Sequence, residues 1–175
     1  MSAGTPDTDG IRVTPYEPSH REAIARLILS IQRDEFGFDI TLEQQPDLSS
    51  IPAFYQRGAG NFWVALAGDS VIGTIALTDI GANQVALRKM FVAASHRGAE
   101  LGIAARLLDV ALRWASQHAV KGVLLGTTEK FRAAHRFYEK HGFTQVAKTT
   151  LPSSFPLMAA DTRFYRLDLA QPTHD

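Results

Sequence analysis

Residues 92–104, VAASHRGAELGIA, place an arginine, two glycines and an acid between an apolar run and a helical pattern. A strand that turns through glycine into a helix directs backbone N–H groups into one concavity, where the helix dipole adds about half a positive charge. Arg97 offers a fork of donors to phosphate oxygens, and Gly98 and Gly102 permit a close backbone approach. Glu100 repels an anion unless its carboxylate points away. The junction is therefore either an anion-binding loop or a plain helix cap, and it matches neither the GxGxxG nor the P-loop pattern.

Cysteine and histidine usage argues against a metal centre. The chain has no cysteine, which excludes a disulfide framework, a thiolate zinc site and a cysteine nucleophile. Two ligands on one helix need i, i+3 or i, i+4 spacing, which His135 and His141 lack. His96 and His118 fall in other segments. We expect solvated or capping histidines and no metal.

The bulk composition is that of an ordinary soluble globular protein. The 175 residues are 45% hydrophobic and 21% charged, enough for one domain with a buried core. Lys and Arg total 18, as do Asp and Glu, so no net charge recruits nucleic acid or an anionic membrane. No apolar run approaches the roughly 18–20 residues of a membrane span, and the first residues do not form a secretory signal. We expect a cytoplasmic protein with a disordered leader over residues 1–10, one domain over 11–170 and a tail over 171–175.

Hydrophobic periodicity predicts the elements that position these residues. A first strand ends at Pro15, and a helix follows over residues 19–36, with Ser19 and Glu22 spaced as a capping box. Residues 37–60 are interrupted by prolines and glycines and predict a long loop with at most one short helix. Later strands are predicted over residues 61–68, 70–80, 83–92, 122–128, 143–151 and 162–170, and later helices over 101–119 and 131–142. This order predicts a mixed α/β fold, a single domain whose central twisted mixed sheet is flanked by helices.

Two motifs in this framework resemble the GNAT superfamily of acyl-CoA-dependent N-acyltransferases. The first resembles the pattern that opens the pyrophosphate-binding helix of that family, at Val92, Arg97, Gly98, Gly102 and Ala104. The second resembles the pattern that closes the coenzyme site, at Ala134, Tyr138, Gly142 and Phe143. The order of elements over roughly residues 11–170 is similar as well. The resemblance favours the anion-binding interpretation of the junction.

The resemblance implies that an amine attacks the thioester of acetyl-CoA directly, in a cleft between splayed central strands. The backbone N–H of Phe91 or Val92 is the implied donor to the thioester carbonyl. The implied coenzyme-binding residues are Met90, Phe91, Val92, Arg97, Gly98, Ala99, Glu100, Leu101, Gly102, Ile103, Ala104, Phe131 and Ala134. Glu100 stands where the family has the middle glycine of the loop, but its N–H remains, so we expect binding to survive. Phe131 stands where many members have an asparagine that contacts the pantetheine arm, which calls that side-chain contact into question.

Tyr138 is the candidate general acid. Its phenol, with an ordinary pKa near 10, could protonate the departing thiolate, whose ordinary pKa is near 8.5. From the residues alone a core position on an amphipathic helix is the alternative, and the family pattern favours catalysis. Many members carry a carboxylate on the strand before the loop, where this chain has Arg88 and Lys89. The general base stays open between water relays and acids at the edges of elements bordering the cleft, namely Glu35, Asp79 and Asp161.

The acceptor side is implied to lie between the loop after the first helix and the loop over residues 151–165. Both loops are rich in Phe, Pro and Leu and contain acids, which suits a small amine with a hydrophobic body. Arg88 and Lys89 would favour a carboxylate instead, as in an amino acid, if they face the cleft. We expect the acceptor to be a primary amine of a small molecule or peptide, with no nucleic-acid or membrane partner.

Two rival functions remain open from the sequence. A non-catalytic acyl-CoA-binding or sensing module would keep the fold without turnover, and the missing strand carboxylate keeps this rival open. An interaction scaffold would have no affinity for the coenzyme. An apolar face on the last strand is either core or the interface of a homodimer.

Overall fold

The computed structural model describes residues 10–98 and 100–170. The expected leader and tail lie outside these residues, apart from Gly10. One seven-stranded mixed sheet forms the centre of the structure, with the strand order β1-β2-β3-β4-β5-β7-β6. The strands are β1 (Ile11–Pro15), β2 (Asn61–Ala67), β3 (Ser70–Gly81), β4 (Gln84–Val92), β5 (Gly122–Thr127), β6 (Thr144–Val146) and β7 (Arg163–Asp168). β4 and β5 are parallel and all other neighbours are antiparallel, so the predicted α/β fold with a mixed sheet is confirmed.

The helices follow the predicted order, with differences at their ends. They are α2 (Arg21–Leu29), which continues as the π-helical η2 (Ser30–Glu35), α3 (Pro46–Ser49), α4 (Ile51–Phe54), α5 (Ile103–Gln117) and α6 (Arg132–Lys140). Short 3-10 turns lie at η1 (Pro18–His20), η3 (Ala94–His96) and η4 (Lys148–Thr150). In the described part of the chain, no helix has the length and apolar character needed to span a bilayer.

Two local predictions about the first helix and the loop after it are wrong. Ser19 and Glu22 do not form a capping box, because the chain first makes the turn η1, where the Glu17 N–H donates to His20 Nδ1 at 3.2 Å. The segment after η2 contains two short helices, α3 and α4, rather than at most one. Each begins with a proline in its first turn, where the missing N–H costs no helical hydrogen bond.

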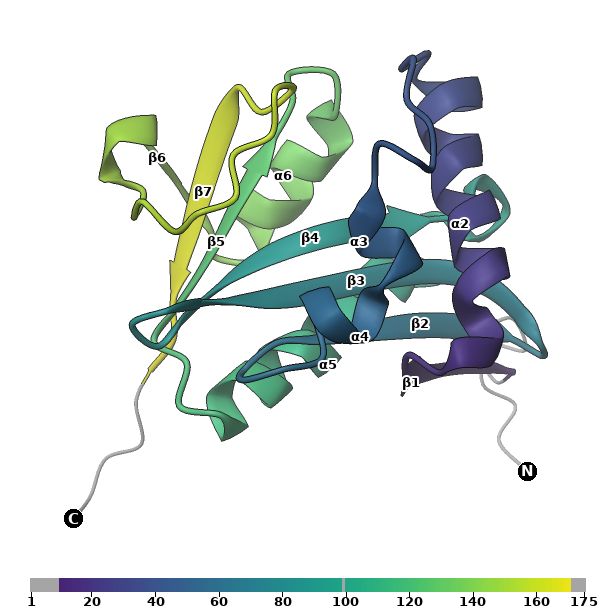
Figure 1. The fold of residues 1–175 in the computed structure, drawn as a ribbon, viewed down its shortest axis with the longest axis horizontal. Coiled ribbons are helices and arrows are strands. Elements are labelled where there is room, and N and C mark those ends of the chain that lie inside the picture. The colour runs from purple at the N-terminus through teal and green to yellow at the C-terminus, as the bar shows by residue number, and fades with distance from the viewer. Residues whose placement is uncertain (1–9, 99, 171–175) are drawn as a thin grey trace.

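Helices cover both faces of the sheet (Figure 1). Along β2, Phe62 and Val64 belong to the apolar cluster that includes residues of α2, α3 and α4. Trp63 and Ala65, which alternate with them, belong to the cluster that includes residues of α5. Because successive side chains of a strand point to opposite faces, β2 is buried on both sides. The two helical layers therefore hold the central strands in fixed positions.

The sheet divides between β4 and β5. These parallel strands pair only from Gln84–Gly122 to Ala86–Leu124. Beyond this point they diverge, and Figure 1 shows β5 rising away from β4. The carboxyl-terminal half of β4, including Met90, and the end of β5, including Leu125, line a cleft between them.

Candidate active site

The cleft where β4 and β5 separate has a volume of about 800 Å³. Its floor comes from residues 87–92 of β4 and 125–127 of β5. Its walls come from η2 and the loop after it, the start of α6, and the loop between β6 and β7. In addition to Arg97, six residues predicted from the sequence to take part in coenzyme binding or catalysis line this cleft, namely Met90, Phe91, Val92, Phe131, Ala134 and Tyr138. The topology thus brings segments far apart in the sequence to one cavity.

A bulge in β4 shapes the floor of the cleft. The pairing with β3 passes from Thr74–Phe91 to Ala76–Arg88, so β4 holds an extra residue at this point. Lys89 lies in the left-handed region with φ 53°, which is uncommon for a residue other than glycine. The fully buried Thr74 hydroxyl donates to the Lys89 carbonyl oxygen at 2.7 Å and holds the bulge. Bulges re-aim side chains, and this one brings both Arg88 and Lys89 to the cleft wall.

Beyond the bulge, the backbone of Val92 faces away from β3. The neighbouring Ala93 N–H donates to Ile72 O in β3 at 2.8 Å. Successive residues of a strand direct their N–H and C=O groups to alternate sides, so those of Val92 point toward the cleft side of β4. In agreement with this orientation, the Val92 carbonyl accepts from Arg97 Nε at 2.7 Å.

The Arg97 side chain crosses to the opposite wall of the cleft. Its Nη1 and Nη2 donate to Glu35 Oε1 and Oε2 at 2.6 and 2.9 Å, which is a bidentate pair. The Arg97 and Glu35 side chains are 40% and 31% exposed, so solvent screens the pair. Glu35 therefore holds Arg97 from the end of η2, rather than acting as a free carboxylate in the cleft.

The turn between β4 and α5 leaves backbone donors available. Gly98 has φ 118° and Gly102 φ 62°, so both positions require the left-handed region that glycine adopts without strain. The Gly102 N–H donates to Gly98 O at 3.1 Å. Within residues 10–98 and 100–170, the N–H groups of Gly98, Glu100 and Leu101 have no hydrogen-bond acceptor. The Glu100 side chain is exposed, and Ala99, also predicted to bind the coenzyme, lies outside the described residues.

The start of α5 contributes its backbone rather than its side chains. Ile103 is 1% exposed and packs in the core, and Ala104 is half-buried. The first N–H groups of a helix lack acceptors within the helix, so those of α5 add to the donors of the turn. Leu101, Gly102, Ile103 and Ala104 do not line the cleft itself, so any contact they make lies at its rim.

Tyr138 reaches the cleft from α6 through an aromatic cluster. Its ring packs against Phe137, Phe143 and Tyr165, with centroid distances of 5.6, 5.5 and 6.1 Å. Burial raises the pKa of the Tyr138 phenol well above its ordinary value, so the group keeps its proton at neutral pH. Within the described chain its hydroxyl has no hydrogen-bond partner but is not fully buried, and the residue lines the cleft. Tyr138 is therefore both a core residue of its helix and part of the cavity lining.

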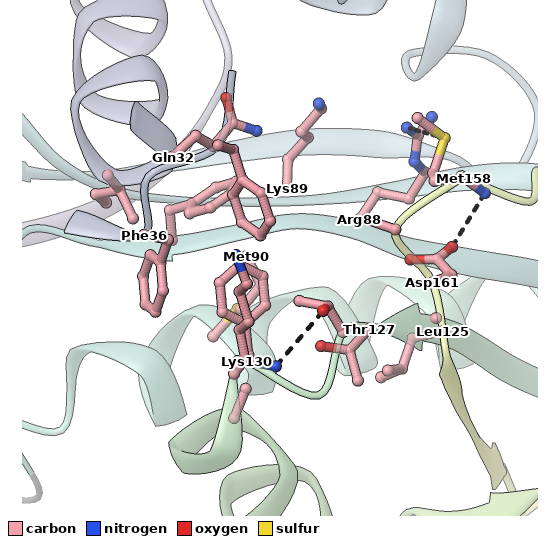
Figure 2. Close-up of a pocket in the computed structure, with 18 of the residues that line it drawn as sticks. Gln32, Phe36, Arg88, Lys89, Met90, Leu125, Thr127, Lys130, Met158 and Asp161 are labelled. Atoms are coloured by element: carbon pink, nitrogen blue, oxygen red, sulfur yellow. Dashed lines mark hydrogen bonds between the residues drawn. The ribbon is translucent and has the colours of Figure 1, made fainter. Parts of the chain in front are cut away.

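Phe131 closes the cleft on the side of α6. Its ring meets Phe36 edge-to-face at 4.6 Å and Phe38 at 5.9 Å between centroids. Lys130 Nζ lies 4.7 Å from the Phe38 ring centroid. The Phe131 side chain thus forms an apolar contact between the start of α6 and the segment after η2. Figure 2 shows Phe36 and Lys130 on this side of the cavity.

The other end of the cavity carries two opposite charges. Arg88 Nη2 lies 3.4 Å from Met158 Sδ, and Asp161 Oδ2 accepts from the Met158 N–H at 3.1 Å. Burial raises the pKa of Asp161, and the Met158 N–H and the Arg88 charge oppose this shift. A Cβ on Gly126 would lie 2.6 Å from Asp161 Oδ2, so glycine at this position makes room for the carboxylate against β5.

At the cavity wall, Lys89 belongs to a mostly buried polar network. Its Nζ lies 3.5 Å from Asp47 Oδ2 and donates to Gln45 Oε1 at 2.6 Å. Gln45 exchanges two hydrogen bonds with Gln32, and the Tyr55 hydroxyl donates to Asp47 Oδ2 at 2.5 Å. Burial lowers the pKa of Lys89, and Asp47 opposes the shift. The network neutralises Lys89 and fixes the loop after η2 to β4, whereas Arg88 remains directed into the cavity.

The remaining candidate acids and histidines lie elsewhere. Asp79 accepts from the Ala59 and Gly81 N–H groups at 2.9 and 2.8 Å. It does not line the cleft, so the prediction that it borders the cleft is wrong. His118 and His141 bond carbonyls at the ends of their helices, as capping residues do. His135 is neither solvated nor capping, since it is 5% exposed and bonds Thr128 O at 2.9 Å. Among the described residues, no group of three or more His, Asp or Glu side chains is placed to hold a metal ion.

Sequence reasoning missed the residues that organise the part of the cleft around the bulge. Thr74, Asp47 and the Gln32–Gln45 pair were not singled out, although each is a buried polar residue. Thr74 carries the clearest indication, because it interrupts the apolar run of residues 71–77. Its partner on β4 cannot be read from the sequence, because the pairing depends on the bulge.

Comparison with known proteins agrees with this geometry. The sequence profile of the acetyltransferase (GNAT) family matches residues 25–143. An N-acetylaspartate synthetase from Danio rerio is 38% identical over 111 residues, which are 61% of this chain and 39% of that protein. N-acetyltransferase family 8 member 2 from Rattus norvegicus is 33% identical over 107 residues, or 58% of this chain and 46% of that protein. The chain thus spans less than half the length of these two relatives.

Solved structures match over nearly the whole chain. An acetyltransferase of the GNAT family from Staphylococcus aureus Mu50 has a TM-score of 0.87 at 38% identity and covers 91% of this chain and 99% of its own. The N-acetylglutamate synthase from Neisseria gonorrhoeae, complexed with coenzyme A and N-acetyl-glutamate, shares the fold at 15% identity, with a TM-score of 0.69 over 92% of this chain and 35% of its own. Since the family profile covers more than half of the sequence and the fold agrees, the chain belongs to the GNAT family of acetyltransferases.

Proposed function

We propose that the protein transfers an acetyl group from acetyl-CoA to a primary amine of a small molecule or peptide by direct attack. The observation that carries this proposal is the continuous cleft between the diverging strands β4 and β5. One end lies beside Arg97 and the turn before α5, and the other holds Arg88 and Asp161. Residues 11–170 would act as one catalytic domain, without a metal ion.

The residues at the first end fit the diphosphate of coenzyme A. The N–H groups of Gly98, Glu100 and Leu101, which have no acceptor among the described residues, suit anionic oxygens together with the start of α5. Apart from the chain neighbours, no atom of the described residues lies within 4 Å of the position where a Cβ on Gly98 would be, so the backbone there is open to a ligand. Arg97 would leave Glu35 for the diphosphate, whose two charges attract the guanidinium more strongly than one carboxylate does. The exposed Glu100 carboxylate would stay in solvent.

The residues between the two ends would carry out the transfer. The N–H of Val92 would donate to the thioester carbonyl oxygen, because the backbone of Val92, unlike that of Ala93, faces the cleft side of β4. Tyr138 would give its proton to the leaving sulfur. The raised pKa keeps the Tyr138 proton in place until the charge on the sulfur develops, but it also makes the phenol a weaker acid. Because a phenol with a raised pKa leaves a strongly basic phenolate, this group must regain a proton from the attacking nitrogen during the same transfer step.

The relatives support a small-molecule acceptor. N-acetylaspartate synthetases are named for an acetylated amino acid, and 38% identity over 111 residues links the Danio rerio protein to this chain. The aligned part includes less than half of that protein, so its acceptor enters here only as support. Aspartate itself is one member of the class of primary amines that the cavity could hold.

A binding measurement followed by a turnover measurement tests the proposal. Acetyl-CoA should stabilise the protein in thermal unfolding, by about 2.7 kcal/mol at a hundredfold excess over Kd. Free CoA thiol should then appear when a panel of primary amines is added. Stabilisation without amine-dependent thiol release would identify a sensing module instead. No stabilisation at all would overturn the proposal in favour of a scaffold.

A further inference from the structure

We propose that the acceptor is a zwitterionic amino acid, whose carboxylate binds Arg88 and whose ammonium group binds Asp161, which takes one proton from it before attack. This inference rests on the proposed acetyl transfer and adds the acceptor class and the base to it. Arg88 and Asp161 both line the end of the cavity opposite the turn before α5. Figure 2 shows both side chains beside Met158.

The Arg88 guanidinium has N–H donors left for a ligand. It contacts the sulfur of Met158, which is a weak acceptor, and within the described part of the chain it forms no ion pair. Its charge acts on Asp161 and Lys89, and the guanidinium also interacts with the buried Tyr55 hydroxyl, which uses part of its donor capacity at this end. A planar guanidinium with free N–H groups matches a carboxylate in a bidentate geometry. Arg88 therefore suits a carboxylate of the acceptor.

Lys89 does not compete for that carboxylate. Its ammonium group is held by Asp47 and Gln45, and its side chain is only 8% exposed. The two neighbouring cations of the bulge therefore differ, because Lys89 is paired with Asp47, whereas Arg88 forms no ion pair within the described part of the chain. At this end of the cavity, Arg88 is thus the cation that can bind a carboxylate of the acceptor.

Asp161 is placed for the ammonium group. The missing side chain at Gly126 lets the carboxylate lie directly against the end of β5, where a Cβ would stand 2.6 Å from Oδ2. Oδ2 accepts one hydrogen bond from the Met158 N–H, which leaves lone pairs for a further donor. Its raised pKa, opposed by Arg88 and the Met158 N–H, favours proton uptake closer to neutral pH than for an exposed aspartate.

The two charges lie near enough to act on each other, as the binding of both ends of one amino acid requires. Met158 contacts Arg88 through its side chain and Asp161 through its backbone, so the two charges flank a single residue. An α-amino acid carries its ammonium and carboxylate groups on one carbon, and it would satisfy both partners at once. A simple amine would bind Asp161 but leave the Arg88 charge without a partner in a partly desolvated site, which is unfavourable.

The proton and bond changes balance as follows. The ammonium nitrogen gives one proton to Asp161, and its lone pair forms the C–N bond to the acetyl carbon. The C–S bond breaks, and the sulfur receives the Tyr138 proton. The nitrogen then loses its second proton as the amide forms, and that proton restores the phenol. Asp161 releases its proton to solvent, so the net products are the N-acetyl amino acid, free CoA thiol and one proton.

Matched acceptor pairs test the acceptor class. CoA thiol release is measured with leucine, phenylalanine and aspartate, and with the decarboxylated amine and the methyl ester of each. We expect at least one amino acid to exceed both of its counterparts by about 30-fold or more in kcat/KM, the size of a charge pair lost from a partly buried site. Equal rates for the amino acid and its decarboxylated amine would overturn the inference but leave the proposed function intact. No thiol release with any amine, while acetyl-CoA still binds, would overturn both.

Variants assign the two residues. Arg88→Gln should raise KM for the amino acid about 30-fold or more and leave the decarboxylated amine nearly unchanged. Asp161→Asn should lower kcat about 100-fold and remove the acidic limb of the pH profile. Arg113→Gln and Asp109→Asn, which break an exposed pair on α5, are the matched controls and should change neither value.

Retained stabilisation by acetyl-CoA shows that each variant folds. If Asp161→Asn fails to fold, Gly126→Ala provides the second test, because the new methyl group displaces the carboxylate without removing it. Its kcat should fall with acetyl-CoA binding retained. An Arg88→Gln variant that affects both acceptors equally, or an Asp161→Asn or Gly126→Ala variant with unchanged kcat, would contradict the assignment.

Discussion

The two ends of the cleft are built from different parts of the chain. At the end proposed to bind the coenzyme, hereafter the coenzyme end, the donors are mostly backbone N–H groups of one continuous turn between β4 and α5. At the acceptor end, side chains from β4, the segment after η2 and the loop before β7 meet. A backbone site needs only a local turn that glycine permits, whereas a side-chain site needs long-range packing to hold each group.

This difference affects stability as well as recognition. The turn before α5 places no ionisable side chain in the core, and its Arg97–Glu35 pair is partly exposed. Next to the acceptor end, Lys89, Asp47 and Tyr55 are all buried away from solvent. Buried charges cost free energy unless every partner is present. We therefore expect substitutions behind the acceptor end to affect folding, and those in the coenzyme turn to affect binding alone.

The largest effect is expected from Asp47→Ala. This change leaves the Lys89 ammonium without its counter-charge and the Tyr55 hydroxyl without its acceptor, both in the core. The free energy of unfolding should fall by about 3–5 kcal/mol, measured by urea titration. Adding Lys89→Met to this variant should cost less than the sum of the two single changes. Strict additivity would mean that the pair does not couple the loop to β4.

The next effect, on the chemical step, is expected from Tyr138→Phe. The ring and its aromatic packing remain, and only the proton donor to the sulfur is removed. Turnover should fall about 100-fold or more, while the Kd for acetyl-CoA stays within about twofold. Tyr16→Phe, in the core on the other face, is the matched control and should leave turnover unchanged. An unchanged kcat in Tyr138→Phe would remove this residue from the mechanism.

Alkaline unfolding compares the middle of the cleft with the network behind its acceptor end, through one tyrosine each. Burial raises the pKa of Tyr138, between the two ends, and of Tyr55, behind the acceptor end, above the ordinary value near 10. Above that pH the unfolded chain loses these protons and the folded chain keeps them, so stability falls as pH rises. Each tyrosine should contribute about 1.4 kcal/mol per pH unit to this loss. Denaturant titrations at pH 9 to 11 should show a smaller slope in Tyr138→Phe and in Tyr55→Phe, and unchanged slopes would contradict the assignment.

The same contrast explains what the sequence could predict. The order of elements along the chain, the helix faces and the turn before α5 follow from periodicity and local motifs, as Gly98 and Gly102 in left-handed conformations illustrate. The Arg97–Glu35 pair joins residues from opposite walls, and the Thr74–Lys89 bond depends on the bulge, so neither is visible locally. Asp161 was one of three candidate acids, and only the fold places it beside Arg88 rather than in a turn like Asp79.

A smaller effect is expected from Glu35→Gln, which weakens a competitor for Arg97. The guanidinium now pairs with Glu35 in a bidentate arrangement, and binding of a diphosphate must replace that pair. The exposed pair is worth at most about 1 kcal/mol, so the Kd for acetyl-CoA should tighten by about fivefold or less. Glu22→Gln removes an exposed acid elsewhere on α2 and controls for net charge. Weaker binding in Glu35→Gln would show that Glu35 positions Arg97 for the coenzyme instead of competing for it.

The smallest effect is expected from Glu100→Gly, in the turn of the coenzyme end. Glu100 is exposed and its N–H has no acceptor within residues 10–98 and 100–170, so the backbone donor is already present in the wild-type protein. Glycine removes a negative charge near the diphosphate but adds backbone freedom worth roughly 0.5–1 kcal/mol, and the two effects oppose each other. Titration calorimetry should give a Kd for acetyl-CoA within about threefold of wild type, and Glu100→Gln, which removes the charge alone, should bind at least as tightly. Because salt screens exposed charges, the advantage of Glu100→Gln should shrink at high ionic strength. A large loss of affinity in both variants would mean that the Glu100 side chain, and not the backbone, makes the contact.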